Sequence, residues 1–161
     1  MIELNLIGVR VELPTNQPIV LLKERDGERY LPIWIGAVEA TAIAFAMQGV
    51  VTQRPMTHDL LKSILEEIGV SVAQISITEL REGTFYSSIR LNMNGAVHEV
   101  SSRPSDAIAL AVRTNVPIFA SEDVVEEAGI TIRDEDAEES EVEEFRRFLD
   151  EVSPEDFRRS N

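Results

Sequence analysis

The strongest constraint on the fold is a pattern that occurs twice along the chain. In each copy, strand-like segments with a turn dipeptide between them lead into an alanine-rich apolar helix and then a short capped helix. Glu39, near the start of the first alanine-rich helix, precedes its counterpart Asp106 by 67 positions. Solenoid repeats are shorter, about 20–50 residues. The pattern therefore predicts an internal duplication, with chance similarity between capped, alanine-rich helices as the alternative.

Alternating and amphipathic patterns define the elements of each half. Strands are predicted at 1–13, 18–24, 30–35, 71–80, 84–93, 96–100 and 116–120, and helices at 36–47, 57–68, 104–114 and 121–128. The dipeptides Asp26-Gly27 and Asn94-Gly95 suit tight hairpins. We expect an α+β fold of internally duplicated β-β-β-α-(β)-α halves, about 1–69 and 70–130, around a mainly antiparallel sheet. The predicted core comprises Val9, Val11, Ile33, Trp34, Ile43, Phe45, Ile75, Ile77, Ile108 and Leu110.

The last 29 residues differ from the body, which we take as one domain over 1–132. Residues 133–161 carry 12 acidic and 5 basic side chains, so we expect an acidic linker. Residues 142–152 place apolar side chains on one helical stripe, which predicts a short amphipathic C-terminal helix that binds a protein partner.

Charge and composition exclude several classes. The formal net charge is −14, so a broad basic face for nucleic acid is excluded, and DNA or RNA would need a local basic site or a metal. The chain has no cysteine, which excludes disulfides and thiolate zinc sites. The apolar stretch 40–51 is too short to span a bilayer, and residues 1–13 do not read as a signal peptide, so we expect a cytoplasmic protein that does not bind membranes.

Short strands leave sheet edges that need cover, and pairing between copies is a common solution. We therefore expect a homodimer or higher homo-oligomer. Its contacts are predicted to come from one sheet edge and from the apolar segment 116–120.

Two Arg-Pro steps run into helices, at Arg54-Pro55 and at Arg103-Pro104. Thr57 and Ser105 follow them and can cap the helix starts. An arginine at this end opposes the helix dipole unless it pairs with an anion. Two interpretations remain open: the arginines, with Thr57 and Ser105, bind a phosphate or carboxylate, or they form structural ion pairs with nearby acids.

Carboxylates early in the helices are the candidates for chemistry. Glu39 and Asp106 lie in apolar segments, where a carboxylate must be paired, neutralised or metal-bound. Together with Asp59 and Glu122 they are numerous enough to hold Mg²⁺ or Mn²⁺. His58, beside Asp59, could act as general acid or base, or could be a surface or capping residue.

Four sequence segments follow one another across residues 1–130. They are Leu31-Pro32-Ile33-Trp34-Ile35-Gly36, then Glu39-Ala40, then Arg54-Pro55 with Thr57-His58-Asp59-Leu60-Leu61, then Ser102-Arg103-Pro104-Ser105-Asp106-Ala107-Ile108-Ala109-Leu110-Ala111. Together they resemble the bifunctional nuclease domain family. The resemblance implies a compact α/β fold and nuclease activity on DNA and RNA, and it does not bring an established catalytic mechanism with it.

Two functional classes follow. The first is a nuclease that hydrolyses phosphodiester bonds, with His58, Asp59, Asp106 and Glu39 in catalysis and with possible dependence on Mg²⁺ or Mn²⁺. The second is a non-enzymatic oligomeric binding or regulatory module that recognises a small anion or a protein partner through the same arginines.

Overall fold

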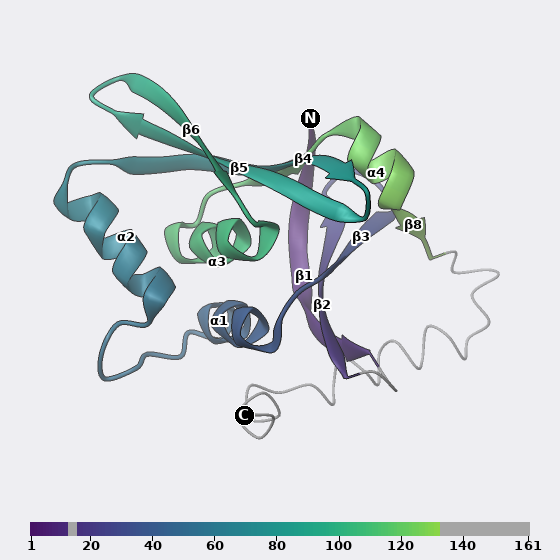
Figure 1. Ribbon diagram of the computed structural model, residues 1–161, viewed down its shortest axis with the longest axis horizontal. Coiled ribbons are helices and arrows are strands. Elements are labelled where there is room, and N and C mark those ends of the chain that lie inside the picture. The colour runs from purple at the N-terminus through teal and green to yellow at the C-terminus, as the bar shows by residue number, and fades with distance from the viewer. Residues whose placement is uncertain (13–15, 133–161) are drawn as a thin grey trace.

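Eight strands form one sheet, in the order β6-β5-β4-β7-β1-β2-β3-β8 (Figure 1). The computed structural model describes residues 1–12 and 16–132. The strands are β1 (Ile2–Glu12), β2 (Gln17–Glu24), β3 (Arg29–Trp34), β4 (Ser71–Arg81), β5 (Thr84–Met93), β6 (Ala96–Ser102), β7 (Ile118–Ala120) and β8 (Ile130–Thr131). The helices are α1 (Ala37–Met47), α2 (Thr57–Glu67), α3 (Pro104–Thr114) and α4 (Glu122–Ala128).

The sheet consists of two three-stranded antiparallel meanders, β1-β2-β3 and β4-β5-β6, on either side of β7. The pairing of β7 with β4 is parallel, and every other pairing in the described sheet is antiparallel. The α+β class and the mainly antiparallel sheet are therefore confirmed. The order of elements repeats between the halves as expected, whereas the duplication itself, which requires the halves to superpose, stays a prediction.

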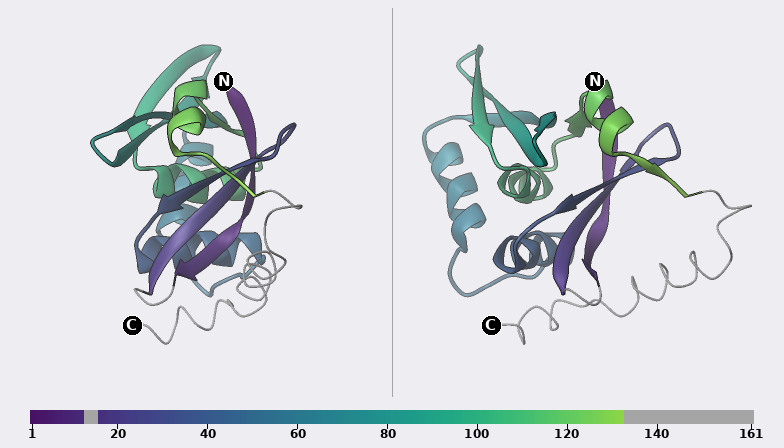
Figure 2. Two further views of the ribbon diagram at one scale, coloured as in Figure 1. Left: turned by 90° about the vertical axis from the view of Figure 1, so that its right-hand side faces the viewer. Right: turned by 45° about the vertical axis from the view of Figure 1, so that its right-hand side comes forward.

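Figures 1 and 2 show the two meanders as arms set at an angle, with α1 and α3 in the corner between them. Helix α1 contacts β1 and β2 of the first arm, and α3 contacts β4 and β5 of the second. Helices α1 and α3 also contact each other, and α2 packs on α3. The starts of helices from both halves are thereby brought to one side of the molecule.

Most of the predicted core is buried. Ile33, Ile43, Phe45, Ile75, Ile77, Ile108 and Leu110 are among the buried residues, as is Val9, while Val11 is partly buried against the same core. The prediction for Trp34 was wrong, because its side chain is 51% exposed. It lies on the opposite face of β3 from the buried Leu31 and Ile33, as the alternation of side chains along a strand requires.

The expected interface segment 116–120 is also placed differently. Strand β7 lies between β4 and β1, and Ile118 and Ala120 are buried there. An interior strand has no unpaired edge to offer a second copy. Strand β7 therefore cannot pair edge to edge with a second copy, and oligomerisation and the contribution of segment 116–120 to it both stay predictions.

Two hairpins test the turn predictions. Asn94 and Gly95 both have positive φ, 51° and 82°, and form the expected two-residue turn between β5 and β6. The connection at Asp26-Gly27 is a longer loop, because β2 ends at Glu24 and β3 begins at Arg29. A second two-residue turn, Glu82-Gly83 with φ of 51° and 78°, was not predicted, since glutamate is not a typical residue at positive φ.

The predicted acidic linker and C-terminal helix lie outside the described residues. Within the described residues, no helix is both long and apolar enough to cross a membrane.

Small residues on the buried side of α3 allow the close packing in the corner of the sheet. Ala107 is completely buried, so Ala107→Leu would force extra methylene groups into a filled space. We expect a loss of about 1–3 kcal/mol in the free energy of unfolding, measured by urea denaturation. Ala73→Leu, on an exposed position of β4, is the control and should change stability by less than about 0.5 kcal/mol. Equal stability of the two variants would contradict the packing assignment.

Candidate functional site

Four charged or polar side chains from three helical regions form a connected chain. The Arg103 guanidinium donates from Nε to Asp106 Oδ2 (3.0 Å) and from Nη1 to Glu39 Oε1 (3.1 Å). The other oxygen of Asp106, Oδ1, lies 2.9 Å from His58 Nε2. Glu39 belongs to α1, His58 to α2 and Asp106 to α3, so the chain joins all three helices. Four of the predicted residues are thus brought together.

Local sequence explains how Arg103 and Glu39 meet. Arg103 is the N-cap of α3, in an extended conformation, and Pro104 follows at the first helical position. Proline at this position fixes the start of the helix, so the arginine side chain leaves from a defined point. Gly36 caps α1, and a Cβ atom there would lie only 2.1 Å from Glu39 Oε2. The absence of a side chain at Gly36 therefore leaves room for the carboxylate that holds Arg103.

Electrostatics keep Asp106 ionised. Burial raises the pKa of Asp106, but the hydrogen bonds from His58 and Arg103 outweigh burial and hold that pKa below its usual value. The Asp106 carboxylate, in turn, is the main reason that the pKa of Arg103 lies above its usual value. An ionised carboxylate only accepts hydrogen bonds, so His58 must donate from Nε2. In a neutral His58 the basic lone pair is then on Nδ1.

A second ion pair joins the same three helices. Arg113, on α3, donates from Nε to Asp59 Oδ1 on α2 (2.6 Å). Its Nη1 and Nη2 donate to the carbonyl oxygens of Ala109 on α3 (2.9 Å) and Ala42 on α1 (3.1 Å). The Arg113 side chain is only 7% exposed. Each of these hydrogen-bond partners lies on a different helix, so the buried guanidinium is a structural tie.

Asp59 also organises the start of α2. Its Oδ2 accepts a hydrogen bond from the Met56 backbone amide (3.1 Å). Burial raises the pKa of Asp59, but the hydrogen bonds from Arg113 and from Met56 outweigh it and hold that pKa below its usual value. The predicted cap Thr57 is instead an exposed first residue of the helix.

Arg113 was not among the predicted site residues. Its signal in the sequence is a single arginine in the last turn of an otherwise apolar, alanine-rich helix, seven positions after Asp106. Residues seven apart lie on one face of a helix. A charge in such a helix requires a partner, but the sequence does not say which of many acids supplies it.

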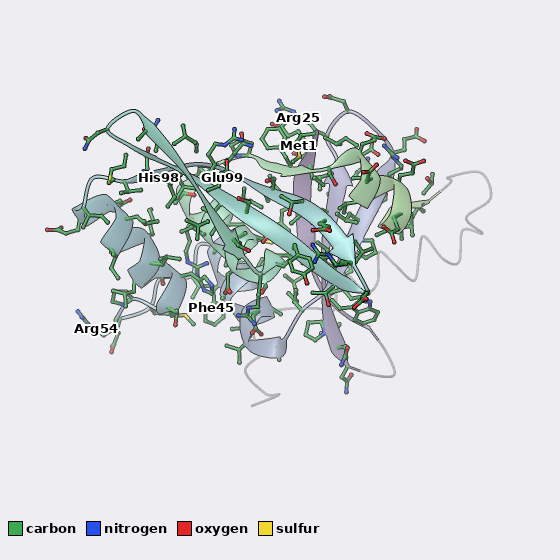
Figure 3. All side chains as sticks on the ribbon, turned by 45° about the horizontal axis from the view of Figure 1, so that its top comes forward. Met1, Arg25, Phe45, Arg54, His98 and Glu99 are labelled. Carbon is green, nitrogen blue, oxygen red and sulfur yellow. The ribbon has the colours of Figure 1, made fainter. Side chains whose placement is uncertain are left out.

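Three other predicted residues, all within the part of the chain that the structure describes, do not join this chain of hydrogen bonds. Figure 3 shows Arg54 at the periphery, pointing away from the body near the start of α2. In the described part of the chain, no ion pair is formed by Arg54. Glu122 forms an ion pair with Arg29 of β3 (3.2 Å), so it does not share an arginine with the other predicted acids. Ser105 is buried in the first turn of α3.

Most carboxylate oxygens of Glu39, Asp59 and Asp106 already accept hydrogen bonds. Both oxygens of Asp106 and both oxygens of Asp59 already accept hydrogen bonds. Among the residues described, no three histidines or acids are placed to hold one metal ion together. Mg²⁺ usually keeps several waters and binds through one or two carboxylates, so the expected divalent cation stays a prediction.

Comparison with known proteins identifies one family over most of the described chain. A family model described as bifunctional nuclease domain matches residues 20–133. The chain belongs to the bifunctional nuclease domain family. The matched range contains all the residues of both ion-pair groups.

Relatives of this domain occur in bacteria and plants. An uncharacterised protein of Mycobacterium tuberculosis is 48% identical over 97% of this chain and 98% of its own length. Bifunctional nuclease 1 of Oryza sativa subsp. japonica is 29% identical over 70% of this chain, and bifunctional nuclease 1 of Arabidopsis thaliana is 30% identical over 63%. The alignments cover 35% and 32% of these two plant proteins, so this chain corresponds to about a third of each.

Removing the Arg113 tie should destabilise the domain. Because Asp59 is 40% exposed, water can rehydrate it when Arg113 is lost. We therefore expect Arg113→Met to cost about 1.5–3 kcal/mol, the scale of a hydrogen bond to a charged group, in urea denaturation. Arg81→Met is the control, because its pair with Glu79 is exposed and should contribute less than about 1 kcal/mol. An Arg113→Met protein as stable as the wild type would contradict the assignment.

The lowered pKa of Asp106 predicts a pH-dependent contribution to stability. The unfolded chain has the higher pKa, about 3.9 for an aspartate. Ionised Asp106 therefore stabilises the fold above that pH, and the contribution is lost as the pH falls through the folded pKa. In urea denaturation at pH 5, 4 and 3, the wild type should exceed Asp106→Asn in stability at pH 5, and the difference should shrink toward pH 3. A difference between the wild type and Asp106→Asn that does not shrink toward pH 3 would contradict the assignment.

Proposed function

We propose that this domain hydrolyses phosphodiester bonds of DNA or RNA where the starts of α1 and α3 meet α2. The observation that carries the proposal is the chain from Glu39 through Arg103 and Asp106 to His58. In this chain one carboxylate, Asp106, is hydrogen-bonded both to a histidine and to an exposed arginine. Membership of a family described by nuclease activity supports the same conclusion.

Each residue has a chemical role in the proposed reaction. Arg103 binds a phosphate oxygen through a charge-assisted hydrogen bond and offsets the charge that develops on it. His58 accepts through Nδ1 a proton from the attacking water, while Asp106 stabilises the imidazolium that forms. The new P–O bond comes from water, the bond to the leaving oxygen breaks, and the leaving oxygen takes up a proton.

Glu39 is a positioning residue in this scheme. It holds one arm of the Arg103 guanidinium and does not touch the reacting atoms. Asp59 is a second positioning residue. Its hydrogen bond from Arg113 fixes the start of α2 and therefore the position of His58. Running the assay with and without EDTA tests the predicted dependence on Mg²⁺ or Mn²⁺.

A hydrolysis assay on single-stranded oligonucleotides tests the proposal. His58→Gln is the most informative variant, because its side-chain amide can still donate to Asp106 but offers no basic nitrogen. We expect its rate to fall by roughly 100-fold or more, the scale of general acid–base catalysis. The matched control is His98→Gln, which changes the exposed histidine of β6 and should leave the rate unchanged. Equal rates for the two variants would remove His58 from the mechanism.

A second candidate is a non-enzymatic module that recognises a small anion through Arg103. The low exposure of His58, 12% of its side chain, favours it, since a general base needs access to water. In that case the carboxylates and His58 only hold the arginine in place. For this candidate we expect the wild-type protein to bind inorganic phosphate and Arg103→Gln to lose that binding. We also expect no hydrolysis by the purified wild-type protein.

A further inference from the structure

A cavity of about 420 Å³ lies beside Arg103. Four parts of the chain line it: Gln17 at the start of β2, residues 33–36 from the end of β3 to the start of α1, residues 83–85 at the turn between β4 and β5, and residues 103–105 at the start of α3. Both halves of the domain thus contribute to one cavity. Its volume is within the range of small-molecule sites, about 300–1,000 Å³.

Trp34 lines this cavity and is the only tryptophan of the chain. Its 51% exposure is unusual for so large an apolar side chain, most of which are buried in folded proteins. An exposed indole ring offers a flat face on which a nucleobase can stack. Gln17 and Thr84 line the same cavity and carry amide and hydroxyl groups that can hydrogen-bond a base.

Arg103 supplies the charge at the same cavity. Its side chain is 65% exposed, although Nε and Nη1 are bonded to Asp106 and Glu39. These two bonds orient the guanidinium and leave Nη2 available among the described residues. A preoriented arginine with a donor to spare suits a phosphate oxygen.

We infer that this cavity binds one unpaired nucleotide, with the base on Trp34 and the phosphate on Arg103. The base of a duplex is stacked and paired, so it would have to leave the helix to reach Trp34. The net charge of −14 also opposes a long polyanionic duplex along the surface. The inference rests on the proposed function for its biological meaning and names its substrate class: single-stranded nucleic acid, or a free nucleoside monophosphate of the same chemistry.

Binding measurements separate these sources. The probes are AMP, inorganic phosphate, a fluorescein-labelled single-stranded hexamer and the matching labelled duplex. AMP and inorganic phosphate are titrated by isothermal titration calorimetry, which also serves the variants at position 34. In the wild type, AMP should in addition quench the intrinsic fluorescence of Trp34 through stacking. The labelled strands are titrated by anisotropy in a His58→Gln background, so that they stay intact. We expect AMP or the hexamer to bind at least about tenfold more tightly than phosphate and the duplex. If the hexamer binds more tightly than AMP, the natural ligand is a single strand. If the two bind equally, it is a free nucleotide.

Substitutions locate the site. We expect Trp34→Ala to weaken binding by about tenfold or more, the loss measured for one base–aromatic stack, and Trp34→Phe to restore most of it. Arg103→Gln should weaken binding of AMP and of the hexamer. The control pair is Arg81 and Tyr86, an exposed arginine 5.0 Å from an aromatic ring centroid on the same hairpin, which does not line the cavity. Arg81→Gln and Tyr86→Ala should bind like the wild type.

Three results would overturn the inference: unchanged binding in a folded Trp34→Ala protein, equal affinity for AMP and inorganic phosphate, or a preference for the duplex. Thermal melting confirms that each variant is folded. The proposed function fails separately. If Trp34-dependent binding is found without any hydrolysis, the nucleotide-binding cavity is supported and the nuclease proposal is refuted. If hydrolysis is found but Trp34→Ala leaves binding and KM unchanged, the nuclease proposal is supported and the nucleotide-binding cavity is refuted.

Discussion

The buried guanidinium of Arg113 is the interaction on which the rest of this domain's polar architecture depends. It lies where α1, α2 and α3 meet. Three directional hydrogen bonds, to Asp59 and to the carbonyl groups of Ala42 and Ala109, fix α1, α2 and α3 relative to one another. A buried cation left without these partners would be strongly unfavourable, so the helices have one acceptable arrangement.

The exposed network follows from that arrangement. Once α2 is held by Asp59, the neighbouring His58 reaches Asp106, and Asp106 shares Arg103 with Glu39. The two groups differ in exposure and hence in role. Arg113 is closed off and serves the fold, whereas Arg103 is open on a cavity and can exchange part of its environment for a ligand. In a protein of net charge −14, the proposed phosphate site requires such a local, oriented cation.

Much of this was accessible from the sequence. The alternating segments, the alanine-rich helices and Asn94-Gly95 carry local signals, and each element they predicted is present within a few residues. His58, Asp106, Arg103 and Glu39 were chosen because a polar residue at the start of an apolar helix needs a partner, and they did become partners. Arg54 carries the same Arg-Pro signal as Arg103, yet it lies at the periphery and forms no ion pair with any described residue. The exposure of Trp34 was missed because Ile33, Trp34 and Ile35 are all apolar, so the sequence does not reveal which face of the strand is buried.

The sequence by itself determined the secondary structure, the acidic character and the kinds of group that would need partners, because these depend on contacts within a few residues and on composition. Tertiary structure alone decided which carboxylate pairs with which arginine. It placed β7 in the interior of the sheet, kept Glu122 beside Arg29, and brought Trp34 to the same cavity as Arg103. These outcomes depend on how two distant halves pack, and partners separated by 48 to 71 positions leave no periodic signal along the chain.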